Sequence, residues 1–560
     1  MSGYNVDRRK FLALIGSLPL AYSCFGAAQL GAQSSVTASS AASTIDVHCH
    51  VFNASDLPIH GFLQRIVFGD EEDQVIFDPD GSRARALFPW LGATLVNMFV
   101  SAPDADAELA YLRDQPRALS GSSTGRDSKE GQERLRRALE QTFSENVQPT
   151  GRARRKFLEQ QNKAGRDLFL EKILEEVGPD PTLNALRASQ KPFEPLARGL
   201  LSGKGPISHH IQWADLLTSY RSEITKKIID TYGEVALFVP ALVDFSGWLD
   251  EEPNTPIGKQ IEIMERIQRL ELGAAVHCMA PFNPWRQVLD EAAGRTPTAL
   301  QLVDTAVMEL GFLGVKLYPP MGFLPIGNAG SGISYPERAA DIPNFPTRID
   351  QALEALYAWA ETHSVPIMAH ATNSNGAADD YSLRAHPKGW ADVFKKYPSL
   401  RLNLAHFGGF DEVRRPGNLD DTWELSIGYL LKSGASDIYA DLSYLHEFLP
   451  GIGEPDQLEL IRSNLALFID RFDPSLEKLM YGSDWSMIGR EKAHEQYFAV
   501  IQRLVRALGV SDRLQRQFFS ENASRFLGLN EGGAARARLV DYYRRNQLDP
   551  EWLQQFGTVQ

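Results

Sequence analysis

Residues 45–52 read I-D-V-H-C-H-V-F, and the rest of the chain is interpreted outward from this stretch. Its apolar residues predict a β-strand, in which successive side chains alternate between two faces. His48 and His50 therefore project in the same direction, so that their imidazoles converge on one point. Neutral imidazole binds divalent zinc, iron, nickel or manganese. The pair is predicted to form half of a metal site, although an H-x-H pattern also arises by chance.

The composition is that of a globular protein without an overall disorder signature. Of the 560 residues, 43% are hydrophobic and 23% are charged, which provides ample material for a core. The net charge of −14 disfavours binding to nucleic acid or to anionic membranes. A chain of this length is compatible with one α/β barrel that carries one large insertion.

Residues 1–44 differ in composition from the rest and are predicted to be an export signal and linker. Arg8 and Arg9 precede an apolar region, and the pattern R-R-x-F-L resembles a twin-arginine signal. This resemblance implies the twin-arginine export machinery as a partner and a periplasmic location. An uncleaved anchor over residues 11–28 is the alternative, but Gly16 and Pro19 make that segment a poor membrane span.

A long stretch with little strand signal, about residues 57–232, follows the first predicted strand. Helical patterns run over Glu133–Asn146, Ala153–Val177 and Ile207–Ile229. We therefore predict a mainly helical insertion after the first strand. It forms either a lid over the site or a passive packing element, since loops at this face of a barrel commonly build the substrate pocket.

Apolar runs of strand length then alternate with amphipathic segments of helix length. This alternation is typical of a parallel sheet covered on both sides, and a count of eight indicates closure into an α/β fold of the (β/α)8 TIM barrel type. The domain spans residues 45–560, and its predicted strands are 45–51, 235–245, 274–282, 312–318, 366–372, 401–407, 438–442 and 479–483.

Polar side chains stand at the carboxyl ends of several of these strands, where the active sites of such barrels form. Lys316 lies within an apolar run, where an unpaired ammonium would cost several kcal/mol. It needs a partner, a depressed pKa or a covalent change. His370, His406 and Asp484 end the fifth, sixth and eighth strands. Barrel closure would bring all of them next to the H-x-H pair.

The combined set of H-x-H, Lys, His, His and Asp on strands one, four, five, six and eight resembles the amidohydrolase superfamily of metal-dependent hydrolases. The G-S-D-W sequence at residues 482–485 is most similar to the amidohydrolase-related branch. The resemblance implies one or two divalent ions, with zinc as the expected metal. In the single-metal form, which we favour, the ligands are His48, His50, His370 and Asp484, and His406 is the catalytic base.

The alternative is a two-metal form, because the K-L-Y-P strand is similar to that of dihydroorotase. By that similarity Lys316 would be carbamylated and would bridge two metals. His48, His50 and Asp484 would then hold the more buried ion, and His370 and His406 the second.

The resemblance further implies that metal-activated water cleaves an amide, lactone or ester bond of a small-molecule substrate. Asp484 would accept the proton of that water, while the metal or His406 polarises the carbonyl. Two other classes remain open. One is a lyase of the same barrel family, a metal-dependent decarboxylase or hydratase, and the other is a non-catalytic barrel that acts as a binding module.

Further side chains near the strand ends are candidates for contact with the substrate. Tyr318 and Trp485 flank predicted ligands and are expected to form pocket walls. Arg384 follows the fifth strand on a loop and is expected either to bind a carboxylate or to serve as a cap or an exposed charge. Weaker candidates, for ligand orientation, turn formation or ion pairing, are Asn53, Asp56, Asp244, Asn283 and Arg286, whereas His209 and His210 are expected to be structural.

Overall fold

The computed structural model describes residues 44–68, 84–114, 129–144, 161, 163–178, 193–410, 413–434 and 437–556. The chain divides into two units, Met1–Ala41 and Ala42–Gln560, and every described residue belongs to the second. The predicted export signal therefore lies outside the described residues, with only Thr44 of the linker included. Among the described helices, none is both long enough and apolar enough to cross a membrane.

Each of the eight predicted strand regions contains at least one strand, and every strand pair in the described part of the chain is parallel. The protein is therefore of the α/β class with parallel sheets. The strands are β1 (Thr44–Cys49), β2 (Val235–Pro240), β3 (Ala275–Val276), β4 (Met279–Pro281), β5 (Gly314–Leu317), β6 (Ile367–Thr372), β7 (Leu402–Gly408), β8 (Ile438–Asp441) and β9 (Leu479–Met480).

The region 274–282 corrects one prediction, because it holds two short strands instead of one. The break falls at His277 and Cys278, between β3 and β4. The amide of Cys278 donates to the side-chain oxygen of Gln268 at 3.0 Å, which takes it out of the strand ladder. The ring of His277 is held by the carbonyl of Gly311 and the hydroxyl of Tyr543. Side-chain partners from other elements thus interrupt a strand that looks continuous in sequence.

The strands pair in sequence order within two sheets, β1-β2-β3 and β4-β5-β6-β7-β8-β9. Backbone contacts join the sheets at both ends of this order. Ala241, just after β2, pairs with Met279 of β4. At the other end, Val47 of β1 donates to the carbonyl of Tyr481 at 3.2 Å, beyond β9. The last strand segment therefore lies beside the first, which places residues 481–485 next to the H-x-H stretch.

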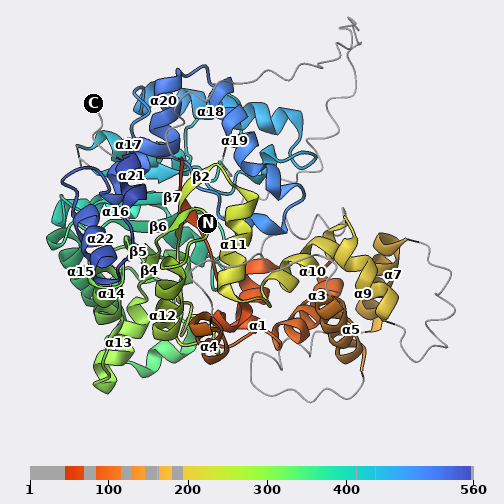
Figure 1. The fold of residues 1–560 in the computed structure, drawn as a ribbon. Helices are drawn as coiled ribbons and strands as arrows, with labels where there is room; N and C mark the ends of the chain where they lie inside the picture. The colour runs from red at the N-terminus through yellow and green to blue at the C-terminus, as the bar shows by residue number, and fades with distance from the viewer. Residues whose placement is uncertain are drawn as a thin grey trace, which may run out of the picture. The chain divides into compact units, whose positions relative to one another are not determined.

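The helices that follow β2 lie between later strands or after the last strand, β9, and Figure 1 shows them around the strands. Local sequence sets their ends, as in α13, where the Asn283 side chain accepts from the amides of Trp285 and Arg286 and Gly294 closes the helix at φ 59°. Asn283 is thus a helix cap. These helices are α12 (Ile257–Gln268), α13 (Pro284–Ala293), α14 (Ala299–Met308), α15 (Phe345–Thr362), α16 (Trp390–Lys396), α17 (Trp423–Lys432), α18 (Pro455–Phe472), α19 (Tyr497–Ala507), α20 (Asp512–Arg516), α21 (Asn522–Leu527) and α22 (Ala534–Arg545).

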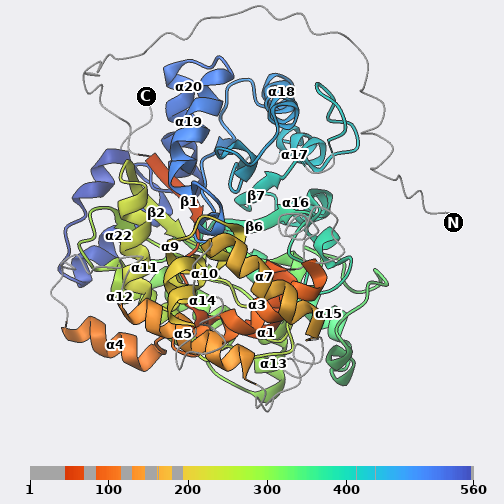
Figure 2. The same cartoon turned by 90° about the vertical axis from the view of Figure 1, so that its right-hand side faces the viewer.

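Between β1 and β2 the described residues form helices and no strand. Helix α3 packs against α5, α7 and α10, and α9 packs against α5, α7 and α10, so that these five helices lie together (Figure 2). The helices of this region are α1 (Ile59–Phe62), α3 (Ala84–Phe99), α4 (Ala105–Asp114), α5 (Lys129–Phe143), α7 (Lys163–Val177), α9 (Glu194–Ser202), α10 (Pro206–Leu216) and α11 (Arg221–Thr231).

The single helix predicted over Ile207–Ile229 is wrong, since α10 and α11 are separate helices with a break at residues 217–220. The carbonyl of Leu217 accepts a hydrogen bond from the amide of Ala54 at 2.9 Å. The carbonyl of Ser219 accepts one from the Asn53 side chain at 3.4 Å. The break therefore binds the loop that follows His50, and this tertiary contact has no signature in the helical pattern.

The buried His277 gives the folded state a predictable sensitivity to acid. Burial lowers its pKa from 6.5 to about 4, opposed by the hydrogen bond to the Gly311 carbonyl. The unfolded chain binds this proton more readily, so stability is fully present above pH 6.5 and is lost as the pH falls toward 4. We expect about 3 kcal/mol of unfolding free energy to disappear over this range.

Urea denaturation of the wild type and of His277→Gln at several pH values measures this contribution. The variant should show a shallower loss of stability between pH 6.5 and 4, whereas His363→Gln, at a partly exposed histidine, should follow the wild type. Identical pH dependence of wild type and His277→Gln would exclude His277 as the source.

Candidate metal centre

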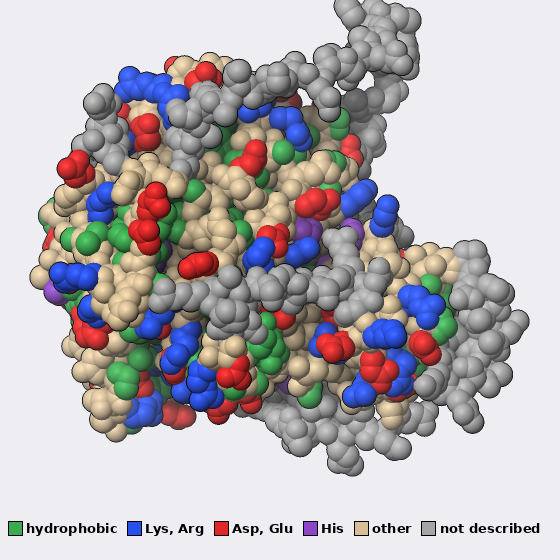
Figure 3. All heavy atoms as spheres, viewed as in Figure 1, with side chains coloured by type: hydrophobic (Ala, Val, Ile, Leu, Met, Phe, Trp, Pro, Cys, Tyr) green, Lys and Arg blue, Asp and Glu red, His purple; other side chains and the backbone are tan. Residues whose placement is uncertain are grey.

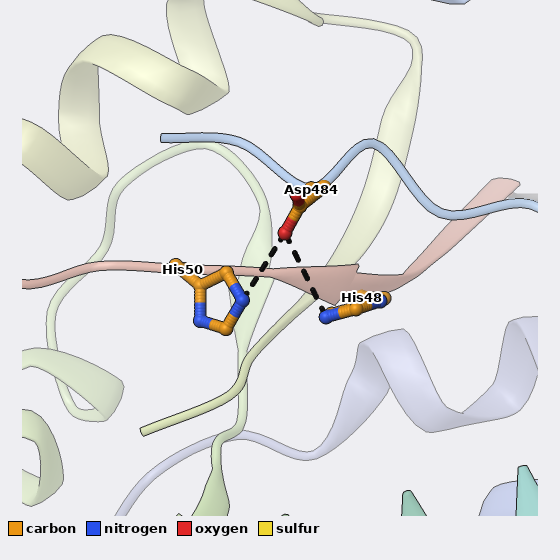
Figure 4. A group of neighbouring side chains, drawn as sticks. All are labelled: His48, His50 and Asp484. Carbon is orange, nitrogen blue, oxygen red and sulfur yellow. Dashed lines mark ion pairs between the residues drawn. The ribbon is translucent and has the colours of Figure 1, made fainter. Parts of the chain in front are cut away.

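His48, His50 and Asp484 converge at one point, as Figure 4 shows, and all three are buried. The Nε2 atoms of His50 and His48 lie 3.1 Å and 3.7 Å from Oδ1 of Asp484. The possible ligand atoms of the three residues all lie within 4.8 Å of one another. The backbone fixes this arrangement, because the amides of Ser483 and Asp484 donate to the carbonyl of His48 at 3.0 and 2.8 Å. The segment after the eighth predicted strand therefore lies beside the first strand.

The His50 ring is oriented so that Nε2 presents a lone pair to Asp484. Its Nδ1 donates to the carbonyl of Ala241 at 2.7 Å, and a carbonyl can only accept. Oδ1 of Asp484 is buried and has no hydrogen-bond partner. The imidazole nitrogen and the carboxylate oxygen both present lone pairs at this short distance, so they need a positive charge between them. Two imidazoles and one carboxylate fit a divalent cation.

The Nδ1 side of the His48 ring contacts two groups that were not predicted from the sequence. Its Nδ1 lies 3.3 Å from Oδ1 of Asp441 and 3.0 Å from the hydroxyl of Ser443. Asp441 also accepts from the Asn403 side chain at 2.6 Å and from the amide of His406 at 3.2 Å. Burial raises the pKa of Asp441, but the charge and hydrogen bond of the His48 ring, together with the nearby His406 ring, lower it more. A carboxylate that accepts a hydrogen bond from one ring nitrogen of an imidazole fixes the tautomer of the ring. It also makes the other ring nitrogen a stronger metal ligand.

Lys316 on β5 contacts His48 of the histidine pair. Its Nζ lies 2.8 Å from Nε2 of His48 and 3.6 Å from the sulfur of Met368. Burial lowers the pKa of Lys316 to about 8, partly offset by Asp484 and Asp441. The partner and the depressed pKa expected for a buried lysine are both present. A cation at Nε2 of His48 would require Lys316 to give up this hydrogen bond.

His370 and His406 complete the cluster. The His406 ring lies 4.6 Å from the His370 ring and 4.8 Å from the His48 ring, between centroids. Nε2 of His370 lies 3.2 Å from the Ser374 hydroxyl, and its buried Nδ1 has no hydrogen-bond partner. Burial lowers the pKa of both rings, most strongly that of His370, so both are neutral at pH 7. The structure thus brings all six predicted polar positions into one buried group.

Two of the predicted substrate-binding residues lie close to this group. The Tyr318 ring is 4.5 Å from the His370 ring and 5.9 Å from Nζ of Lys316. Trp485 directly follows Asp484, is 1% exposed, and accepts a hydrogen bond from the amide of His50 through its carbonyl. Its indole Nε1 is buried without a hydrogen-bond partner.

Arg384 is placed differently. Its guanidinium donates to the carbonyls of Gly322 at 2.5 Å and Ser334 at 2.6 Å, and it lies 3.5 Å from the centre of the Tyr381 ring. These contacts satisfy much of its donor capacity within the protein. Carboxylate binding by Arg384 therefore stays a prediction.

A buried ion network connects the loop after His50 to the helices between β1 and β2. Arg221, at the start of α11, donates to both carboxylate oxygens of Asp56 at 2.7 and 2.5 Å and to Glu108 of α4 at 2.6 Å. Asp56 also accepts from the amide of Asn53 at 3.1 Å. Nothing in the sequence marked Arg221, since an arginine on an amphipathic helix is usually solvated.

The remaining candidates make structural contacts. Asp244 pairs with Arg286 at 2.5 Å. His210 is buried and its Nδ1 lies 2.9 Å from the carbonyl of Pro206. His209 lines a cavity of about 530 Å³.

That cavity lies between the helices of the 57–232 region and the segment after Asp484. It is lined by Trp213, Trp485 and charged side chains of both signs. Acidic and basic side chains are likewise interspersed over the face seen in Figure 3. Trp213 of α10 donates to the carbonyl of Ser486 at 3.1 Å, which ties the helical region to this segment.

Replacing Asp441 with asparagine should weaken the binding of added zinc, as a probe of this donor set, by about 10- to 100-fold, because the amide removes the negative charge beside His48 while keeping the shape. Competition with a zinc chelator measures the dissociation constant. Asp456→Asn, at an exposed acidic residue of α18, is the matched control. Equal zinc affinity in Asp441→Asn and the wild type would show that Asp441 does not support the metal centre.

Comparison with known proteins finds one family model that matches part of the chain. Residues 274–529 match the family described as Amidohydrolase. The matched region contains Lys316, His370, His406 and Asp484, whereas His48 and His50 precede it. Among curated proteins, none matches the chain.

Solved structures give weaker similarities. A probable 2-pyrone-4,6-dicarboxylic acid hydrolase from Acinetobacter baumannii is 15% identical over 54% of this chain and 88% of its own, with a TM-score of 0.33. An amidohydrolase from Burkholderia multivorans with bound zinc is 13% identical over 56% and 91%, with a TM-score of 0.35. A TIM-barrel protein from Bordetella bronchiseptica is 15% identical over 55% and 82%, with a TM-score of 0.34.

Proposed function

We propose that this protein is a metal-dependent hydrolase that cleaves an amide, lactone or ester bond of a small molecule. The observation that carries the proposal is the convergence of two imidazole Nε2 atoms on a buried carboxylate oxygen that lacks a hydrogen-bond partner. The match of residues 274–529 to an amidohydrolase family supports it. No separate observation supports the lyase or the binding-module alternative.

We further propose that the strands form a (β/α)8 barrel and that the helices between β1 and β2 are an insertion. Parallel pairing in sequence order, together with backbone bonds between the last strand segment and β1, supports the barrel. The contact from Trp213 to the Ser486 carbonyl supports a role for the insertion near the site. In this arrangement all six polar residues meet at the carboxyl ends of the strands.

His48, His50 and Asp484 would hold the metal, with His370 as the fourth ligand in the single-metal form. Imidazole nitrogen and carboxylate oxygen suit zinc, which we propose as the resident ion. When bound, such an ion lowers the pKa of a water ligand from near 16 to about 7.

The chain's own residues would carry out the proton transfers. Asp484 has a carboxylate oxygen with no hydrogen-bond partner, and this oxygen can accept a proton from the attacking water. It can later return that proton to the leaving group. His406 lies within the same cluster, where its ring can act on the proton of the water or on the oxygen of the scissile carbonyl.

A substrate screen on zinc-loaded and chelator-treated protein tests the proposal. The panel contains nitrophenyl esters, lactones and N-acyl amino acids, and the readouts are nitrophenolate, acid and amine release. We expect turnover of at least one class that disappears on chelation and returns with zinc. Equal turnover in chelated and loaded protein would contradict a metal-dependent hydrolase. A second panel consists of carboxylic acids, and carbon dioxide as the only product from that panel would contradict it as well.

The metal-to-protein ratio of the loaded protein distinguishes the two forms of the site. A ratio near one supports the single-metal form with Lys316 as a free amine. A ratio near two supports carbamylated Lys316 with His370 and His406 on the second ion.

We also propose that residues 1–44 direct export to the periplasm through the twin-arginine machinery. Replacing both Arg8 and Arg9 with lysine should abolish export, since the arginine pair is the feature that resembles the signal. Cell fractionation in a bacterial host with that machinery measures the outcome. Unchanged periplasmic protein in the double variant would contradict this route.

A further inference from the structure

Ser443, just after β8, bridges two of the clustered histidines. Its hydroxyl oxygen lies 3.0 Å from Nδ1 of His48 and 2.9 Å from Nδ1 of His406. A serine hydroxyl carries one hydrogen, so it can donate to only one of the two rings. The direction of this bridge therefore depends on which ring nitrogen of His48 carries a hydrogen.

Two neighbours independently place the hydrogen of His48 on Nδ1. On that side lies the Asp441 carboxylate, 3.3 Å from Nδ1, and a carboxylate can only accept. On the other side lies the ammonium of Lys316, 2.8 Å from Nε2, and an ammonium can only donate. The reverse tautomer would put a lone pair against the carboxylate and a hydrogen against the ammonium.

We infer that Ser443 donates its hydroxyl hydrogen to Nδ1 of His406 and thereby holds that ring in the tautomer with its hydrogen on Nε2. His48 Nδ1 cannot take the hydroxyl hydrogen, because it carries a hydrogen of its own. Asp441, the other acceptor beside this hydroxyl, already accepts from the Asn403 side chain and from the amides of His406 and Ser443. The hydroxyl hydrogen is therefore left for Nδ1 of His406 at 2.9 Å, which accepts it. A neutral imidazole that accepts at Nδ1 carries its hydrogen at Nε2. Ser443 is thus a positioning residue that acts through His406.

This tautomer determines what His406 can do in the proposed hydrolase. Nε2 of His406 has no hydrogen-bond partner among the described residues. A nitrogen that carries a hydrogen does not ligate a metal and does not take up a proton. It can donate a hydrogen bond to the carbonyl oxygen of a substrate, where negative charge develops. The role assigned here rests on the proposed function, whereas the tautomer does not depend on any reaction.

Nitrogen NMR of protein labelled with ¹⁵N-histidine reports the tautomer, since protonated and unprotonated ring nitrogens resonate in well-separated regions. The His406 signals are assigned by their loss in His406→Gln. In the wild type we expect Nε2 of His406 in the protonated region and Nδ1 in the unprotonated region. A hydrogen on Nδ1 of His406 in the wild type would overturn the inference without any variant.

Two variants of Ser443 test whether its hydroxyl fixes the tautomer of His406. Ser443→Ala removes the hydroxyl, so the His406 signals should shift toward a mixture of the two tautomers. Ser443→Thr keeps a hydroxyl and should preserve the wild-type spectrum. An unchanged His406 tautomer in folded Ser443→Ala would overturn the role of Ser443. These outcomes are independent of the substrate screen, so failure of the hydrolase proposal and failure of this inference are distinguishable.

Discussion

Replacing Asp484 with asparagine is expected to lower kcat/KM of the zinc-loaded protein by about 10²- to 10⁴-fold, the range attributed to a general base. The amide keeps the size of the side chain but cannot accept the proton of the attacking water. It also replaces an anionic oxygen that lies 3.1 Å from Nε2 of His50, so zinc retention should fall as well.

The measurement combines steady-state kinetics on the substrate found in the screen with elemental analysis after dialysis. Asp470→Asn, at an exposed acidic residue of α18, is the matched control and should behave as the wild type. Circular dichroism checks that the Asp484→Asn variant is folded. Wild-type turnover and full zinc content in that variant would remove Asp484 from the site.

Replacing Arg221 with methionine is expected to lower the free energy of unfolding by about 3 to 5 kcal/mol, the range for breaking a buried ion pair from one side. Arg221 is completely buried, and its loss would leave Asp56 and Glu108 as uncompensated buried charges. Because Asp56 lies in the loop after His50, the variant should also retain less zinc.

Urea denaturation measures the change in stability. Arg513→Met, at an exposed arginine of α20, is the control and should change the unfolding free energy by less than about 0.5 kcal/mol. Adding Asp56→Asn and Glu108→Gln to Arg221→Met should recover part of the loss, because the buried charges are then removed. Wild-type stability of Arg221→Met would show that the network contributes little.

The positions of the strands could be predicted because apolar runs of strand length are local features of the sequence. The residues that follow these runs could be identified for the same reason, and His48, His50 and Asp484 do lie together. These residues could be predicted to lie together although they are far apart in the chain, because parallel strands place their carboxyl ends at the same edge.

The missed features all depend on contacts between distant segments. Asp441 and Ser443 matter only because β8 lies beside β7 and because residues 481–485 lie beside β1. Arg221 looks like a solvated helix residue until α4 and the loop after His50 enclose it. The division of Ile207–Ile229 into two helices likewise follows from the hydrogen bond between Ala54 and Leu217. No periodic pattern in the chain encodes such partners.

Anomalous diffraction from crystals of the zinc-loaded protein tests the central claim most directly, because it locates the metal without assuming a substrate. We expect a zinc peak within about 2.0 to 2.2 Å of Nε2 of His48, Nε2 of His50 and a carboxylate oxygen of Asp484. A fully loaded protein whose zinc lies elsewhere, or whose density at these three residues contains no metal, would contradict the account.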